Sequence, residues 1–327
     1  MYEIRVNPWL TFLMYSLHFY GQMIADAQRM EAYAAALRAV VQPDSVVMDL
    51  GCGPGVFAVL ACKLGARRVY AVEPENVIGL AREIVAANGC ADRIEFFDKL
   101  STEITLPEPA SVIVSDLRGV LPWFEQHIPS IIDTRTRLLA RGGVLIPRRD
   151  ILWAALVEAP AQYSELVGPW QENTFDLDLS AGERLITNNW RKTHVEPEQF
   201  LAEPVCWTTI DYYEVESPDI HAQMSWQVAR NGTAHGVAVW FDSELVDGIR
   251  ISNHPAAPKM IYGAGLFPFP QPVAMMEGEH IEFRLAADLV HDGYVWRWET
   301  DFPKASFKQS TFYGVPLSAA QLRKSAQ

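Results

Sequence analysis

The first half of the chain alternates short apolar runs with amphipathic segments. Runs rich in β-branched residues, typical of buried strands, fall at 45–50, 68–72, 93–97, 111–115 and 143–147. Helical patterns at 56–64, 77–87 and 126–139 separate them, and another occupies 25–41. This alternation predicts a parallel sheet with helices on its faces. We therefore expect an α/β domain of the Rossmann type at 43–150, preceded by a helical segment at 1–42.

The second half has a different pattern. Aromatic-rich, strand-like runs at 205–213, 222–229, 236–241, 280–286 and 294–299 are separated by Gly, Pro and Asn turns. Such runs are typical of an antiparallel barrel or sandwich, and we assign a β-barrel domain to 151–303. Residues 170–204 carry few periodic apolar positions and predict an excursion from that domain. The last stretch, 304–327, is predicted to be an extension.

Composition limits the possible partners. The 327 residues are 49% hydrophobic, enough for a core in each of two domains, and 27 Lys+Arg against 40 Asp+Glu give a net charge of −13. This charge argues against binding to nucleic acid or an anionic membrane and favours a cationic substrate. The segment 9–20 is too short to span a bilayer and lacks a basic leader. Four cysteines without CxxC spacing predict a reducing compartment, the cytoplasm, and no metal site.

A glycine-rich loop follows the first predicted strand. The strand ends near Asp49, and Gly51, Gly53 and Gly55 come next, immediately before a helix. Glycines let a backbone turn approach a ligand closely, and the helix that follows offers free N–H groups. A dinucleotide fingerprint would place its third glycine at Val56. An acidic residue followed by GxGxG is instead the pattern of S-adenosylmethionine binding.

A second carboxylate supports this interpretation. Glu73 ends the next predicted strand, twenty residues after Gly53, where a carboxylate can accept hydrogen bonds from both hydroxyls of a ribose. Two alternatives stay open. The glycines could serve only a tight turn with Glu73 simply ending a strand, or the loop could bind NAD.

At this point the chain resembles the protein arginine methyltransferases. The run Met23-Ile24-Ala25-Asp26-Ala27-Gln28-Arg29 is similar to the M-x-x-D-x-x-R helix of that family, whose arginine binds the carboxylate of the cofactor. The resemblance implies this role for Arg29, and a guanidinium can indeed bind a carboxylate through two parallel hydrogen bonds. A surface arginine on a helix is the alternative. The backbone around Lys99 and Leu100 is expected to lie along the adenine.

The segment 115–125 resembles the double-glutamate loop of the family, S-E-x-x-G…F-E. Its second acid matches Glu125, whereas the first is Asp116, one methylene shorter. A guanidinium has a pKa above about 12 and cannot be deprotonated in advance, so an enzyme must hold it while one nitrogen attacks. Two carboxylates could bind two of its nitrogens and polarise the third. Alternatively, Asp116 caps a turn and Glu125 begins a helix.

The likeness continues to the end of the second domain. Residues 141–147 are similar to the G-G-x-x-x-P end of the family's cofactor domain. The excursion at 170–204 lies where the family inserts its dimerisation arm, which implies a homodimer. The T-H-W loop should fall at 260–262, which reads Met-Ile-Tyr and keeps only the aromatic Tyr262. The N-terminal Y-F-x-x-Y motif is present only in part, as Tyr15 with Phe12.

These observations give one hypothesis and its rivals. We expect an S-adenosylmethionine-dependent methyltransferase that modifies a guanidino group of arginine, free or in a peptide, with Tyr15, Arg118 and Tyr262 contacting the substrate. Arg118 favours free arginine, whose α-carboxylate it could bind, unless it pairs with Asp116 or Glu125 instead. The rivals are a small-molecule N- or O-methyltransferase and a catalytically silent scaffold dimer.

Overall fold

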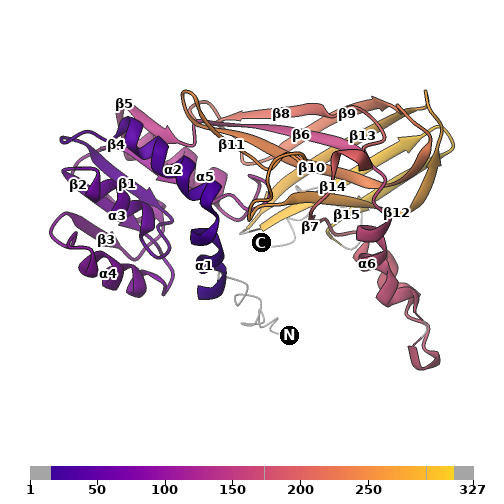
Figure 1. Ribbon diagram of the computed structural model, residues 1–327, viewed down its shortest axis with the longest axis horizontal. Helices are drawn as coiled ribbons and strands as arrows, with labels where there is room; N and C mark the ends of the chain where they lie inside the picture. Colours follow the sequence, from indigo (N-terminus) through magenta and orange to yellow (C-terminus); the bar gives the residue numbers. More distant parts are fainter. Residues whose placement is uncertain (1–15, 173, 292, 313–327) are drawn as a thin grey trace, which may run out of the picture.

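The N-terminal lobe of the chain is a parallel sheet flanked by helices (Figure 1). The structure is a computed structural model that describes residues 16–172, 174–291 and 293–312. The strands of this sheet are β1 (Val46–Leu50), β2 (Arg68–Val72), β3 (Ile94–Phe97), β4 (Ala110–Ser115) and β5 (Leu139–Ile146). All pairs are parallel and the order is β3-β2-β1-β4-β5. The strand order reverses between β1 and β4, and open α/β sheets bind ligands at such a point.

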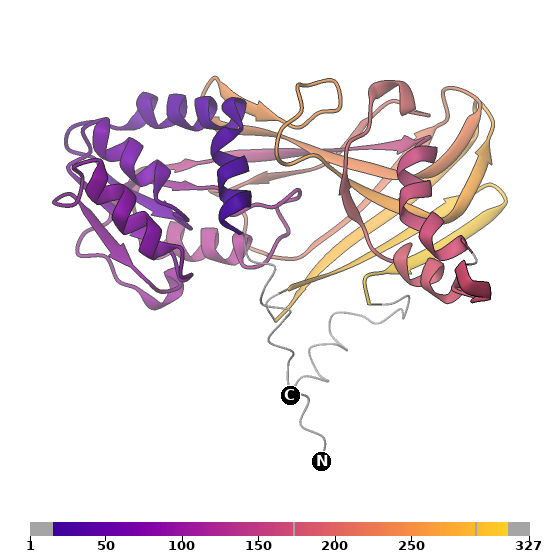
Figure 2. The same cartoon turned by 60° about the horizontal axis from the view of Figure 1, so that its bottom comes forward.

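Five α-helices accompany this sheet, namely α1 (Leu17–Ala25), α2 (Ala27–Val40), α3 (Val56–Lys63), α4 (Ile78–Ala87) and α5 (His127–Arg137). The single helix expected at 25–41 is wrong at its start, because α1 precedes it and Asp26 separates the two. Asp26 has extended backbone angles, and its carboxylate accepts the N–H of Arg29 at 3.1 Å, which caps α2. In both ribbon views α1 lies between the two lobes of the molecule (Figures 1 and 2). Within the described part of the chain, no helix is long and apolar enough to cross a membrane.

The C-terminal lobe is antiparallel, as predicted. Its strands are β6 (Arg149–Val157), β7 (Arg191–Thr193), β8 (Val205–Asp211), β9 (Ile220–Gln227), β10 (Gly232–Val246), β11 (Ile249–Ser252), β12 (Ala264–Met275), β13 (His280–Val290), β14 (Gly293–Phe302) and β15 (Ala305–Ser310). One sheet has the order β7-β12-β10-β6-β8 with β11 beside β10, and the other is β15-β14-β13-β9. Because β15 pairs with β14, the domain continues past the boundary predicted at residue 303.

Strand β12 was not predicted, because it contains Pro268, Pro270 and Pro272. A proline has no N–H to donate to a neighbouring strand. On one side β12 pairs with β7 only over residues 264–266. On the other side its register with β10 shifts between Pro268 and Val273, so Pro270 and Pro272 lie outside the paired positions. The sheet therefore tolerates these prolines.

A helical arm projects from the C-terminal lobe (Figures 1 and 2). It consists of α6 (Pro160–Gln171) and α7 (Ser180–Ile186), with a 3₁₀ turn at Thr174–Asp176 between them. Two further 3₁₀ turns are Ser101–Glu103 and Pro197–Gln199. The excursion was expected at 170–204, but it begins ten residues earlier, at Pro160. A proline at the first helical turn, where its missing N–H would have no partner, is a frequent helix start.

Aromatic packing and a buried ion pair join the two lobes. Trp123, in the loop after β4, packs against Trp207 of β8 at 5.2 Å between ring centroids. Arg118 of the same loop donates to Asp150 of β6 at 2.6 Å, and both side chains are fully buried. The hydroxyl of Tyr212 donates to the second oxygen of Asp150 at 2.6 Å. The charge of Asp150 is thus shared between a cation and a phenol inside the protein.

This ion pair gives a stability prediction. Asp150→Ala should lower the free energy of unfolding by about 3–5 kcal/mol, because it removes the hydrogen-bonded partner of the buried Arg118 charge and leaves only Asp116, 3.8 Å away. The double variant Arg118→Met/Asp150→Ala removes both charges and should recover most of that loss. Chemical denaturation followed by tryptophan fluorescence measures both values. If the double variant is as unstable as Asp150→Ala alone, the unpaired charge is not the cause.

Candidate functional site

A cavity of about 650 Å³ opens where the strand order of the parallel sheet reverses. Its walls come from α1, from the loop between β1 and α3, from the segments that follow β2 and β3, and from the stretch between β4 and the first turn of α5. This volume lies within the range of roughly 300–1,000 Å³ common for small-molecule sites.

The glycine loop forms one wall of the cavity, and two of its three glycines line that wall. Gly51 and Gly53 line it, both with positive φ (+70° and +51°). A Cβ on Gly53 would lie 2.7 Å from a ring carbon of Tyr20 in α1, and one on Gly51 would lie 2.1 Å from a methyl carbon of Leu117. The loop therefore depends on glycine both for its conformation and for the close approach of the other walls.

Asp49 and Gly55, predicted as cofactor contacts, lie behind this wall and do not line the cavity. The carboxylate of Asp49 accepts the N–H of Ala58 at 2.8 Å, a donor in the first turn of α3 that has no partner within its helix. Burial raises the pKa of Asp49 to about 7. Gly55 caps α3 in the left-handed conformation, with φ +79°. Both residues shape the loop from within.

Glu73 closes the adjoining part of the wall. One of its oxygens accepts the N–H of Gly53 at 2.9 Å, and the other accepts the N–H of Glu75 at 3.0 Å. Burial raises the pKa of Glu73, while these two N–H groups act in the opposite direction. Each carboxylate oxygen has two lone pairs, so each can still accept a hydrogen bond from a ligand. Lys99 and Leu100 also line the cavity, and both are exposed.

Arg29 also lines the cavity, from the first turn of α2. Its Nε donates to Asp116 at 2.6 Å, and its Nη1 donates to the carbonyl of Met23 at 3.2 Å. The guanidinium packs over the ring of Phe57, 5.1 Å from its centroid. Among the described residues none hydrogen-bonds to Nη2, which is thus available to an anionic group in the cavity. A guanidinium held at Nε and Nη1 has a fixed plane, so the direction of Nη2 is fixed too.

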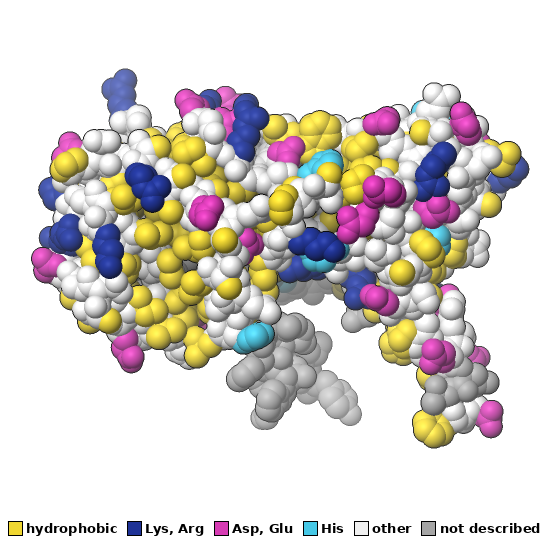
Figure 3. Space-filling view, in the orientation of Figure 1, with side chains coloured by type: hydrophobic (Ala, Val, Ile, Leu, Met, Phe, Trp, Pro, Cys, Tyr) yellow, Lys and Arg dark blue, Asp and Glu magenta, His cyan; other side chains and the backbone are white. Residues whose placement is uncertain are grey.

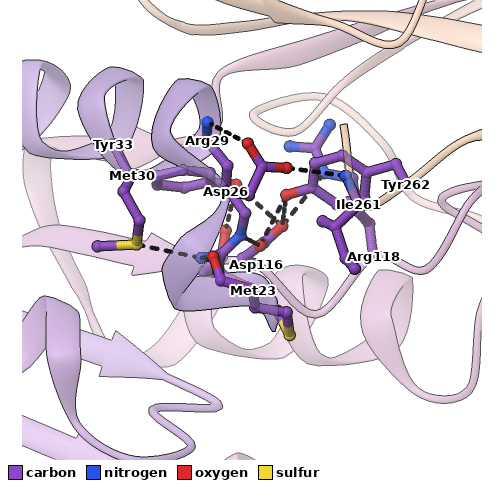
Figure 4. Close-up of polar contacts among 10 residues, drawn as sticks. Met23, Asp26, Arg29, Met30, Tyr33, Asp116, Arg118, Ile261 and Tyr262 are labelled. Carbon is purple, nitrogen blue, oxygen red and sulfur yellow. Dashed lines mark hydrogen bonds and ion pairs between the residues drawn. The ribbon is translucent and has the colours of Figure 1, made fainter. Parts of the chain in front are cut away.

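The two predicted carboxylates have different surroundings. Asp116, whose side chain is only 4% exposed, is enclosed by donors from both lobes (Figure 4). The hydroxyl of Tyr262 lies 2.9 and 2.8 Å from its two oxygens, and that of Tyr33 lies 3.1 Å from the first of them. The second oxygen accepts from Arg29, and the Nε of Arg118 lies 3.8 Å from the first. The charge of Asp116 is therefore balanced within the protein.

Glu125 lines the same cavity with its carboxylate free. Among the described residues none hydrogen-bonds or ion-pairs with this carboxylate, and its backbone has a positive φ of +44°, which is uncommon for a residue with a side chain. Partial burial and, to a smaller extent, the charge of nearby Glu75 raise the pKa of Glu125. A cation that entered this part of the cavity would relieve both effects.

Of the three residues predicted to contact the substrate, two do not line the cavity and the third is outside the described residues. Arg118 is fully buried in its pair with Asp150, so the prediction that it binds the carboxylate of free arginine is wrong. The alternative, an ion pair with Asp116, is present at 3.8 Å, but the shorter pair with Asp150 was not predicted. Tyr262 is 5% exposed and does not line the cavity, because its hydroxyl faces Asp116. Tyr15 lies outside the described residues.

Several residues that line the cavity were not predicted from the sequence. Tyr20 and Met23 of α1 cover the cavity, and His127 of α5 forms part of its wall. The hydroxyl of Tyr212 uses its hydrogen on Asp150, so it can only accept from His127 Nε2 at 3.1 Å, which places the ring proton on Nε2. Burial and the charge of Arg118 lower the pKa of His127 to about 3, so the ring is neutral at pH 7. Met23 begins the M-x-x-D-x-x-R run and Tyr20 lies just before it, so this run was the signal that could have identified both residues.

The cavity has one place that suits an anionic group and another that suits a cationic group. Arg29 can bind a carboxylate, and Glu73 together with the loop N–H groups can bind hydroxyls, so one elongated ligand would extend from Arg29 along the glycine loop. Glu125 attracts a cation at the remaining part of the cavity. Among the described residues, no group of His, Cys, Asp and Glu side chains is placed to hold a metal ion.

In comparisons with known proteins, the two lobes of the chain match two different family models. Residues 148–298 match the family model described as the arginine methyltransferase oligomerization subdomain, and residues 32–158 match that of the ribosomal protein L11 methyltransferase. Protein arginine N-methyltransferase 2 of Dictyostelium discoideum is 31% identical over 238 residues, which are 69% of this chain and 46% of the relative. The mouse protein of the same name is 29% identical over 282 residues, 81% of this chain and 62% of the relative. The chain thus spans about half to two thirds of the length of these relatives.

Solved structures share the fold. A chain of the Trypanosoma brucei PRMT1 enzyme–prozyme heterotetrameric complex with AdoHcy superposes with a TM-score of 0.81 at 22% identity, covering 92% of this chain and 98% of that one. Arabidopsis thaliana protein arginine methyltransferase 10 gives a TM-score of 0.77 at 21% identity, covering 90% and 97%. Both the parallel lobe and the antiparallel lobe are therefore included in the likeness.

Proposed function

Since this chain belongs to the protein arginine methyltransferase family, we propose that it transfers a methyl group from S-adenosylmethionine to a guanidino group of arginine. The observation that carries the proposal is the free carboxylate of Glu125 in a cavity whose other charged groups suit the cofactor. Among the other acidic residues that line the cavity, Glu73 binds backbone N–H groups of the loop and Asp116 is enclosed by donors.

The residues present fit the cofactor. Arg29 would bind its carboxylate through Nη2, Glu73 would accept from the ribose hydroxyls, and Leu100 would lie against the adenine. When bound, S-adenosylmethionine supplies a methyl group on a positively charged sulfur. The carboxylates of Glu73, Glu75 and Glu125 line the same cavity, so the protein offsets the charge of both reactants.

Glu125 performs two tasks in this proposal. Its carboxylate accepts hydrogen bonds from the acceptor guanidinium and orients one nitrogen toward the methyl group. The acceptor nitrogen would gain the methyl group as the sulfur–carbon bond of the cofactor breaks to leave S-adenosylhomocysteine, and Glu125 would take the proton that this nitrogen loses. The raised pKa of Glu125, caused by partial burial and then by Glu75, makes this carboxylate a better base.

The assay combines labelled S-adenosylmethionine with free arginine, an arginine-containing peptide with blocked ends, or a cell extract. We predict transfer to a guanidino acceptor and a loss of about 100-fold or more in Glu125→Gln at saturating cofactor, with cofactor affinity unchanged within a few fold. Glu83→Gln, an exposed residue of α4, is the matched control and should behave as wild type. Full activity of Glu125→Gln would contradict the proposed mechanism, and transfer only to non-guanidino groups would contradict the proposed substrate.

We also propose that the chain forms a homodimer through its arm, within the cytoplasm. The arm carries four exposed apolar side chains, Trp170, Phe175, Leu177 and Leu185, and Phe175 is 89% exposed. Figure 3 places hydrophobic side chains at the arm tip and across the face of the parallel lobe. Two such surfaces on one molecule favour contact with a second copy.

All four cysteines lie in the described part of the chain and are free thiols, which supports a reducing compartment.

The dimer gives its own prediction. Wild type should sediment as a species of twice 36.7 kDa at micromolar concentration, and Phe175→Ser/Leu177→Ser should sediment as a monomer. Met276→Ser removes another exposed apolar side chain, 61% exposed but outside the arm, and should leave the dimer intact. A monomeric wild type, or a double variant that stays dimeric, would refute the arm as the interface.

A further inference from the structure

We propose that Asp116 is a positioning residue for Arg29, and through Arg29 for cofactor binding, and that Glu125 alone among the two acids of this loop holds the acceptor. This inference rests on the proposed function. It assigns the two carboxylates, which lie nine residues apart in one loop, to two different ligands.

Three donors already surround the carboxylate of Asp116, and together they can fill three of its roughly four lone-pair positions. Tyr262 approaches both of its oxygens, at 2.9 and 2.8 Å, Tyr33 approaches one at 3.1 Å, and Arg29 approaches the other at 2.6 Å. These donors come from α2 and from the C-terminal lobe, so they surround the carboxylate on more than one side (Figure 4). An acceptor guanidinium at Asp116 would have to share this buried carboxylate with those donors, and any donor that it displaced would lose its partner.

Local charge leads to the same conclusion. Two guanidinium groups, those of Arg29 and Arg118, lie within 4 Å of Asp116. A third guanidinium beside that carboxylate would meet two like charges in a poorly solvated place. Glu125 has the opposite environment, because its charged neighbour is the carboxylate of Glu75. A cationic acceptor is therefore attracted to Glu125, whereas the charge of Asp116 is already balanced by Arg29.

The contact with Arg29 explains what Asp116 does instead. The bond from Nε to Asp116 and the bond from Nη1 to Met23 hold the guanidinium plane, so Nη2 keeps one direction. Asp116 also balances the charge of Arg29 in the absence of an anionic ligand. Removing the carboxylate charge should loosen this guanidinium and weaken binding of any carboxylate-bearing ligand in the cavity.

Tyr262 is the second positioning residue in this arrangement. It belongs to the loop that precedes β12, and its neighbour Ile261 donates its N–H to Asp26, the cap of α2, at 2.8 Å. One short segment of the C-terminal lobe thus contacts both Asp116 and the helix that carries Arg29. The hydroxyl of Tyr262 is expected to act on cofactor affinity through Asp116, in the same direction as the carboxylate but more weakly.

The test compares Asp116→Asn, Tyr262→Phe and wild type by calorimetry with S-adenosylhomocysteine and by initial rates. Asp116→Asn should raise both the Kd of S-adenosylhomocysteine and the KM of S-adenosylmethionine by about tenfold or more. At saturating cofactor its kcat and the KM of the acceptor should stay within about threefold of wild type, allowing for the context dependence of such contacts. Tyr262→Phe should shift the same two cofactor constants in the same direction, by less.

Asp247→Asn is the control, since it makes the same chemical change in an ion pair on an exposed turn. Its Kd for S-adenosylhomocysteine, its KM values and its kcat should equal those of wild type. If Asp116→Asn keeps its cofactor affinity but loses kcat at saturating cofactor, Asp116 holds the acceptor and the inference is overturned. Calorimetry with S-adenosylhomocysteine needs no turnover. It therefore decides the role of Asp116 even if no guanidino acceptor is methylated, and so tests this inference separately from the proposed function. Tyr262→Phe keeps the test valid if Asp116→Asn does not fold.

Discussion

Burying the charge of Asp116 is the constraint on which the site depends, because a carboxylate with 4% of its side chain exposed needs donors around it. Those donors are Arg29 and Tyr33 of α2 and Tyr262 of the C-terminal lobe. In meeting that requirement, the chain fixes α2 over the parallel sheet and brings the second lobe against it. The orientation of Arg29, and with it one end of the cavity, follows from the same contacts.

The second consequence is a separation of charge along the cavity. Cations gather around Asp116, whereas Glu73, Glu75 and Glu125 leave the remainder of the wall acidic. An anionic group is drawn to Arg29 and a cationic group to Glu125, so a carboxylate and a guanidinium are directed to different parts of the cavity. This sorting also gives the two acids of the loop after β4 different tasks, although they are similar in sequence.

Local patterns were sufficient to predict the parallel lobe, because each of its strands is a short apolar run and each turn carries its own signal. They also identified Glu73 and the glycine loop, whose roles depend on a few consecutive residues. Strand β12 was hidden by its prolines, and β15 was separated from the domain because its polar sequence resembles an extension. The partners of Asp116 and Arg118 could not be found in this way. Tyr262 lies 146 residues from Asp116, and only the packing of one lobe on the other brings them together.

The most direct test of this account is a crystal structure with S-adenosylhomocysteine and an arginine-containing acceptor bound together. We predict that the acceptor guanidinium contacts Glu125, that Arg29 contacts the carboxylate of S-adenosylhomocysteine, and that Asp116 keeps its bonds to Arg29 and Tyr262. A guanidinium that bridges Asp116 and Glu125, with the hydroxyl of Tyr262 displaced from Asp116, would contradict the account.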